Sequence, residues 1–181
     1  MYNNWITDLT NSSKALSKVL YTILPQYLKG KIHNIETSNN EILVLLDTKS
    51  GIDLIDETST GLLGIASRVQ FCPIQFKPYN TFTIRAERHT GTKTEYEKRT
   101  EQIEKGYLYP ALTMQLYFDN KIDMNFLSGA LIKTINLYRF IKEHPDKIKT
   151  RYSDNKFYYI NFSDLKDYGI GMFSNKIKYM N

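Results

Sequence analysis

The sequence predicts a single α+β domain, residues 1–181, with a mixed and largely antiparallel sheet flanked by about three helices. Three observations lead to this class. Helical and strand-like patterns alternate in the order helix, several strands, helix, further strands, helix, strand. A chain of 181 residues suits one domain. No repeat, low-complexity tract or linker divides it.

The first element is expected to be an amphipathic helix over residues 12–28. From Leu16 onward, apolar residues recur at the i, i+3, i+4, i+7 spacing of a helix with one face on a core. Ser12 and Ser13 can cap its start. Pro25 should kink or shorten it.

Strand patterns follow, separated by turn signals such as Asn39-Asn40 and Thr58–Gly61. The clearest alternation places Arg85 and Glu87 on the polar face of a strand whose other face is apolar. Strands are expected at residues 31–37, 41–47, 52–56, 62–71, 81–88, 109–119, 126–133, 157–162 and 170–180.

Two later helices are expected, at residues 95–105 and 135–143. Thr94 and Glu97 have the spacing of a capping box, in which each side chain bonds the backbone N–H of the other residue. The 95–105 helix has few apolar residues, so it should lie at the surface or against polar groups. Residues 146–155 are polar, and a loop is expected there.

Charge and cysteine content favour a nucleic-acid partner and a reducing compartment. The net charge is +5 and the isoelectric point is about 9.1, and residues 121–181 hold 11 Lys and Arg against 6 Asp and Glu. Such a surplus suits a polyanion. With Cys72 as the one cysteine, no intrachain disulfide can form, which fits the cytoplasm. No apolar run is long enough for a membrane helix.

Two acids, Asp47 and Asp53, flank a Lys-Ser-Gly turn signal. If the chain reverses there, their carboxylates can approach one another, and paired carboxylates suit Mg²⁺. A metal held in this way can activate water for phosphodiester cleavage. The alternative is that both are solvated turn acids.

Polar side chains also occupy strand positions. Arg68 and Gln70 share one strand face, where Arg68 can hold a phosphate or pair with Glu36 or Glu87. On the next strand, Arg85 either pairs with Glu87 or holds a phosphate while Glu87 binds a metal.

The turn after that strand leads into a helix N-terminus, where free N–H groups and the helix dipole favour anions. Lys93 and Thr94 would strengthen such a site, and Arg88, Lys98 and Arg99 lie nearby in the sequence. We expect these residues, with Arg85, to bind phosphate or nucleic acid. The alternative is an ordinary solvated helix cap.

The order of elements around Asp53 in Gly51-Ile-Asp-Leu-Ile resembles the core of the PD-(D/E)XK nuclease superfamily. The resemblance implies a restriction-endonuclease-like fold in which an Asp on one strand and a Glu-x-Lys motif on the next bind Mg²⁺ and activate water. The next strand here has Ala66-Ser-Arg68 in place of Glu-x-Lys. That departure fits either a migrated motif or a catalytically inactive relative.

Three further segments look like parts of uncharacterised proteins of phages and mobile elements, a likeness over roughly residues 45–165. They are Gly64-Ile-Ala-Ser-Arg-Val-Gln70, Thr81-Phe-Thr-Ile-Arg85 and Thr94-Glu-Tyr-Glu-Lys-Arg99. This likeness implies no particular activity.

The resulting hypothesis is a Mg²⁺-dependent nuclease-like protein. Asp53 would hold the metal with Asp47 or Glu87, while Arg68 or Lys93 would hold the scissile phosphate. Gln70 would orient water. The alternatives are a binding module without chemistry, for nucleic acid, a nucleotide or a host protein, and a homo-oligomer joined by ion pairs of its Arg/Glu strand face.

Overall fold

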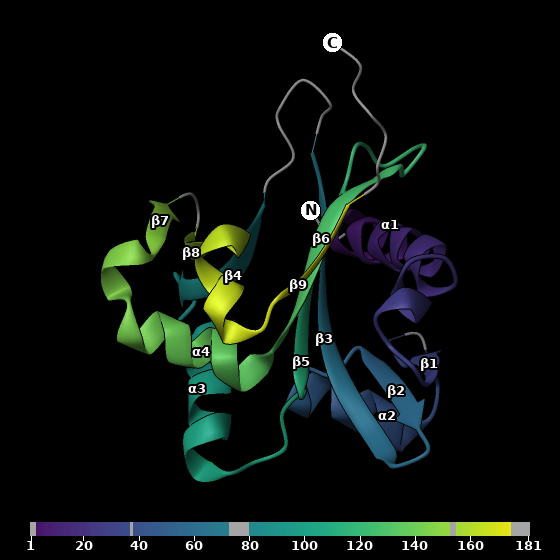
Figure 1. Cartoon of the computed structure of the whole chain (residues 1–181), viewed down its shortest axis with the longest axis horizontal. Coiled ribbons are helices and arrows are strands. Elements are labelled where there is room, and N and C mark those ends of the chain that lie inside the picture. The colour runs from purple at the N-terminus through teal and green to yellow at the C-terminus, as the bar shows by residue number, and fades with distance from the viewer. Residues whose placement is uncertain (1–2, 37, 73–79, 153–154, 175–181) are drawn as a thin grey trace.

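The computed structural model describes residues 3–36, 38–72, 80–152 and 155–174 (Figure 1). The helices are α1 (Asn3–Leu20), α2 (Glu41–Leu45), α3 (Glu95–Lys105) and α4 (Thr134–Glu143), with shorter helical turns η1 (Leu24–Gln26), η2 (Leu46–Ser50), η3 (Pro145–Lys147) and η4 (Phe162–Tyr168). The strands are β1 (Lys31–Asn34), β2 (Leu54–Thr58), β3 (Gly61–Phe71), β4 (Thr81–Arg88), β5 (Leu112–Phe118), β6 (Phe126–Lys133), β7 (Lys149–Tyr152), β8 (Asn155–Asn161) and β9 (Gly171–Ser174).

The strands form two sheets, which confirms the predicted α+β class with a mixed sheet. The large sheet has the order β1-β2-β3-β5-β6-β9, and the small sheet has the order β4-β8-β7. Among the described strands, only β3 and β5 pair in parallel, and the connection between them contains β4 and α3. The remaining described pairs are antiparallel.

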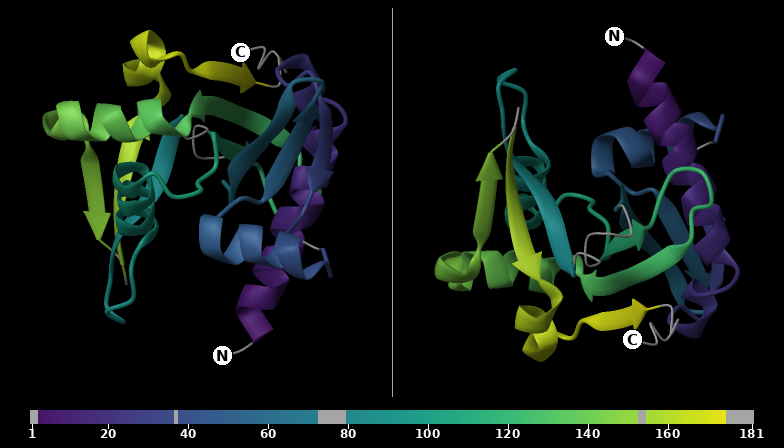
Figure 2. Two further views of the ribbon diagram at one scale, coloured as in Figure 1. Left: turned by 90° about the horizontal axis from the view of Figure 1, so that it is seen from below. Right: turned by 90° about the horizontal axis from the view of Figure 1, so that it is seen from above.

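The large sheet separates two hydrophobic cores. One face packs against α1, with Leu16 and Val19 meeting Leu54, Met114 and Phe118. The other face packs against the small sheet and α4. Figure 2 shows α1 on one side of the molecule, and α3, α4 and the small sheet on the other. No helix in the described part of the chain is long and apolar enough to cross a membrane.

The strand expected at residues 41–47 is wrong, because this segment is helical. The side-chain oxygen of Asn40 accepts hydrogen bonds from the backbone N–H groups of Ile42 and Leu43, at 3.0 and 3.3 Å, and so caps α2. The apolar run has no alternation, and a short run of this kind fits a strand or a helix equally well. Leu45 is 54% exposed, so the run is also less buried than a core strand.

Other boundaries also differ from expectation, among them the end of the first helix, which is at Leu20 rather than at residue 28. The first helix starts at Asn3 rather than at Ser12, since neither Gly nor Pro interrupts the chain between residues 3 and 20. The expected loop at residues 146–155 contains β7, and η4 follows β8. The expected strand at 170–180 is present as β9, and its residues 175–180 lie outside the described part.

The edge of β4 that does not pair with β8 faces the large sheet. Side chains of β5 form hydrogen bonds with some of the backbone groups along this edge. The Tyr117 hydroxyl donates to the carbonyl oxygen of Thr81 at 2.7 Å. The Gln115 Oε1 accepts from the backbone N–H of Thr83 at 3.3 Å. Gln115 is 1% exposed, so these contacts are in the interior, where an unpaired backbone group is costly.

Two more side chains continue this ladder. Arg68 on β3 donates from Nη1 to the carbonyl oxygen of Thr83, and Glu95 on α3 accepts from the backbone N–H of Arg85 at 3.5 Å. Gln70 supports the ladder, since its Oε1 accepts from the Thr83 hydroxyl at 3.3 Å. Polar side chains of β3, β5 and α3 therefore occupy the place of a neighbouring strand along β4.

Replacing Gln115 with leucine should lower the free energy of unfolding by about 1–3 kcal/mol, because it leaves the Thr83 N–H buried without an acceptor. Urea unfolding measures the change. Gln26→Leu makes the same chemical change at an exposed position and should have little effect. Equal losses in the two variants would contradict the role of Gln115 in the ladder.

Candidate functional site

A buried arginine holds the turn after η2 against α3. Arg99 is 7% exposed, and its Nη1 donates to the carbonyl oxygen of Ser50 at 2.7 Å and to Oε1 of Gln102 at 2.8 Å. Its Nη2 lies 3.4 Å from the carbonyl oxygen of Gly51. Gly51 has φ +64°, a left-handed conformation that favours glycine, and a Cβ there would approach Nη2 of Arg99. Arg99, which we expected to bind nucleic acid, thus mainly fixes this turn.

A hollow of about 310 Å³ opens between η2, the end of β4 and α3, and we call it the α3 cleft. Its charged lining is mostly cationic, so the potential in the hollow favours anions. The lining cations are Lys49, Arg88, Lys93, Lys98 and Arg99, and the lining acids are Asp47 and Glu95. Four of these five cations are among the predicted site residues.

The lysines of the α3 cleft differ in how they are paired. Lys93 forms an ion pair with Glu101, whose other oxygen accepts from Lys105 at 2.7 Å. These two lysines lower the pKa of Glu101 to about 2 through their hydrogen bonds. Lys49 and Lys98 form no ion pair within the described residues. Their ammonium groups are therefore available to a ligand.

The N-terminus of α3 does not offer the free anion site that the sequence suggested. The capping box is confirmed: the Thr94 hydroxyl accepts from the backbone N–H of Glu97, and the Glu97 carboxylate accepts from the Thr94 N–H at 2.7 Å. Hydrogen bonds from Thr94 lower the pKa of Glu97. The chain's own carboxylate already occupies this position, and Thr94 is buried.

Beside the α3 cleft, next to its lining residue Glu95, Arg68 and Arg85 lie against the same ring. Their guanidinium carbons are 5.8 and 5.5 Å from the ring centroid of Phe157. Arg68 also lies 3.4 Å from Glu95. The carboxylate partner of Arg68 is therefore on α3, and neither of the strand acids predicted for this role fills it.

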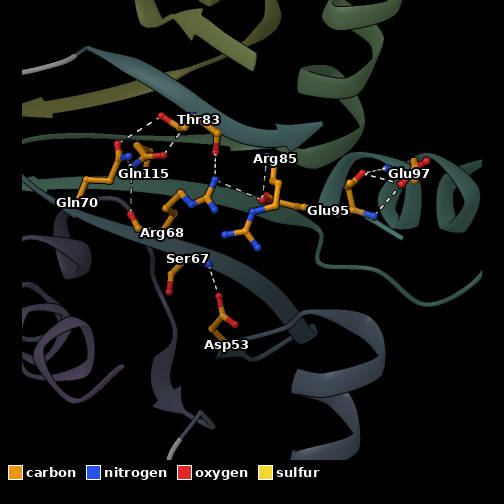
Figure 3. A network of polar contacts seen from close by, with 10 residues as sticks. Asp53, Ser67, Arg68, Gln70, Thr83, Arg85, Glu95, Glu97 and Gln115 are labelled. Atoms are coloured by element: carbon orange, nitrogen blue, oxygen red, sulfur yellow. Dashed lines mark hydrogen bonds and ion pairs between the residues drawn. The ribbon is translucent and has the colours of Figure 1, made fainter. Parts of the chain in front are cut away.

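Asp53 lies at the start of β2, where its carboxylate accepts a hydrogen bond from the backbone N–H of Ser67 (Figure 3). Burial raises the pKa of Asp53 to about 7, against the lowering effect of the Ser67 bond, and the nearby Glu36 and Asp47 raise it further. Burial also raises the pKa of Glu36 and of Asp47. The structure thus brings Asp47 and Asp53 close enough to interact, as the turn signal predicted.

Of the predicted metal ligands, Glu87 lies apart from Asp47 and Asp53 in its contacts. Within the described residues, no group of three or more His, Cys, Asp or Glu side chains is arranged to hold a metal ion. Glu87 instead pairs with Lys156 across β4 and β8, at 2.7 Å. The predicted Arg85–Glu87 pair is wrong, because a bulge between these residues changes the register of β4.

Sequence reasoning missed three contributors. Lys49 lines the α3 cleft, Glu36 interacts with Asp53, and Phe157 contacts two arginines. Glu36 and Lys49 gave no local signal, because distant segments bring them to their neighbours. Phe157 pairs directly with Arg85 across β4 and β8, which an antiparallel pairing of the two expected strands could have suggested.

Comparison of the chain with protein-family models, with curated proteins and with solved structures gives no match. The function therefore has to be argued from the residues of the site alone.

The raised pKa of Asp53 predicts a pH-dependent stability. An acid whose pKa is higher in the folded chain binds its proton more tightly there, so its contribution to stability is present at low pH. That contribution is lost as pH rises from about 4 to about 7. Asp53→Asn should raise the free energy of unfolding at pH 8 by on the order of 2–4 kcal/mol, and by much less at pH 4.

Denaturant unfolding at several pH values measures this difference. Asp146→Asn, at an exposed acid, is the matched control and should show no such trend. A difference between Asp53→Asn and the unmodified chain that stays constant across this pH range would count against the raised pKa.

Proposed function

We propose that this chain binds nucleic acid, with the phosphate backbone lying in the α3 cleft. The observation that carries the proposal is the charge of the lining, five cations against two acids in one hollow. Because phosphate contacts release counterions from nucleic acid, a cationic groove of this kind supplies sequence-independent affinity. Lys49 on η2 and Lys98 on α3 line the hollow from two different elements, so a nucleic acid strand lying between them would contact both.

The residues that were expected to be catalytic have structural contacts instead, which favours binding over catalysis as the first candidate. Arg68 and Gln70, expected to act on the scissile phosphate and on water, hold the edge of β4. Glu87, expected to bind metal, pairs with Lys156. These contacts give each residue a structural role, whereas no comparable contact holds the free lysines of the cleft.

Binding should weaken steeply with salt, and Lys49→Met with Lys98→Met should reduce the slope of log K against log salt by about 1.5, since each lost phosphate contact removes roughly 0.7–0.9. Fluorescence anisotropy with labelled single- and double-stranded DNA and RNA, in EDTA, measures the slopes. Lys29→Met with Lys31→Met removes two exposed cations elsewhere and should leave the slope unchanged.

Absence of affinity for all four nucleic acids would overturn the proposal. It would leave a host protein or a second copy of the chain as the partner.

Cleavage of the bound strand is the second candidate, and one feature favours it. Asp53 interacts with Arg99, which lines the α3 cleft, and with the neighbouring acids Glu36 and Asp47. In the large sheet, β1, β2 and β3 are antiparallel neighbours and β5 is parallel to β3, with α2 between β1 and β2 and with β4 and α3 between β3 and β5. This sheet order also supports the proposed likeness to PD-(D/E)XK nucleases. A group with a pKa near 7 suits proton transfer at neutral pH.

Under this second candidate, the chain should cut nucleic acid with Mg²⁺ or Mn²⁺ and not in EDTA, and Asp53→Asn should abolish cutting while binding persists. Gel analysis of labelled DNA and RNA after incubation tests this, with Asp146→Asn as the control. Binding without cutting under any metal condition would leave the binding function and remove the nuclease.

A further inference from the structure

One cation beside the α3 cleft, Arg85, has no hydrogen-bond or ion-pair partner for its side chain among the described residues. Its Nε atom is buried without a described acceptor. Its one described side-chain contact is with the ring of Phe157. A half-buried guanidinium without an anion is unusual, because removing a charge from water is costly unless a partner compensates.

The neighbours of Arg85 increase this imbalance. Arg68 and Arg88 are close enough for their charges, after burial, to lower the pKa of Arg85. The carboxylate that interacts with Arg85 is Glu95, and Glu95 is shared with Arg68. Arg68 and Arg85 thus share one carboxylate, and Arg88 adds a third positive charge near Arg85, so positive charge is in excess here.

The size of this surplus distinguishes between kinds of phosphate. A backbone phosphodiester carries one negative charge, whereas a terminal phosphate carries about 1.5–2 at neutral pH. Arg88 and Glu95 also line the α3 cleft, so the arginine cluster is continuous with the proposed backbone site. A guanidinium is well suited to a phosphate because its planar donors match two phosphate oxygens at once.

We propose that Arg85, with Arg68 and Arg88, forms a subsite for the terminal phosphate of a nucleic acid strand. The chain would then recognise a phosphorylated strand end in addition to the backbone. This inference rests on the proposed function, because the subsite lies beside the same cleft and shares Arg88 with its lining. Arg85 is the residue assigned to the phosphate, since Arg68 also holds the β4 edge.

The test compares one single-stranded DNA oligonucleotide in three forms: with a 5′-phosphate, with a 3′-phosphate, and with hydroxyls at both ends. Binding is measured in EDTA. One phosphorylated form should bind about tenfold more tightly than the hydroxyl form, since charge-assisted hydrogen bonds contribute on that scale. Which form it is identifies the strand end.

Arg85→Met should bring the three forms within about twofold of one another. Arg85→Lys, which keeps the charge and loses the planar donors, should retain part of the preference. Lys98→Met should weaken all three forms alike, and Lys29→Met should weaken none. The melting temperature of Arg85→Met should stay near that of the unmodified chain, because the side chain of Arg85 forms no described hydrogen bond.

The outcomes separate the two proposals. Equal affinity for the three forms would overturn the terminal-phosphate subsite and leave nucleic-acid binding intact. A preference that survives in Arg85→Met would overturn the assignment of Arg85. No affinity for any form, of DNA here or of RNA in the earlier experiment, would overturn both.

Discussion

The free edge of β4 is the constraint on which the rest of the structure depends. This edge lies in the interior, where backbone N–H and carbonyl groups need partners, and none of the described strands pairs with it. Side chains from β3, β5 and α3 take the place of that strand, through Arg68, Gln115, Tyr117 and Glu95. The two sheets are joined by these polar contacts in addition to the apolar core between them.

The same contacts fix the walls of the α3 cleft. Glu95 meets both Arg68 and the backbone of Arg85, so the first turn of α3 is tied to β3 and β4 together. Arg99, one turn later, holds the carbonyl groups of Ser50 and Gly51. The hollow therefore lies between elements that buried hydrogen bonds keep in place, and a site on a rigid scaffold loses little entropy when a ligand binds.

The parts of the fold that local pattern determines were predictable. The α3 capping box, the alternation of β4 and the antiparallel pair of β2 and β3 all follow from residues close together in the sequence. The helix at residues 41–45 was not predictable in this way, because its apolar run has no period that separates helix from strand. The Asn40 cap was the signal that could have identified it.

The sequence could predict which polar residues belong to the site, but it could not predict which residue each of them pairs with. The sequence indicated that Arg68, Gln70, Arg85 and Glu87 needed partners, but a partner from a distant element leaves no local trace. Arg68 meets Glu95 on α3, and Glu87 meets Lys156 on β8. The bulge in β4 separated Arg85 from Glu87, which a count of alternating positions could not detect.

These pairings distinguish the cations that stabilise the fold from the cations that are free to bind a ligand. Arg68 and Arg99 donate to backbone carbonyl groups, so replacing either would leave those acceptors unpaired and would change stability and binding together. The side chains of Arg85 and Lys98 donate to no backbone carbonyl group among the described residues. A loss of binding in variants of these two residues would therefore reflect a lost contact with the ligand, because the substitutions remove no described hydrogen bond that stabilises the fold.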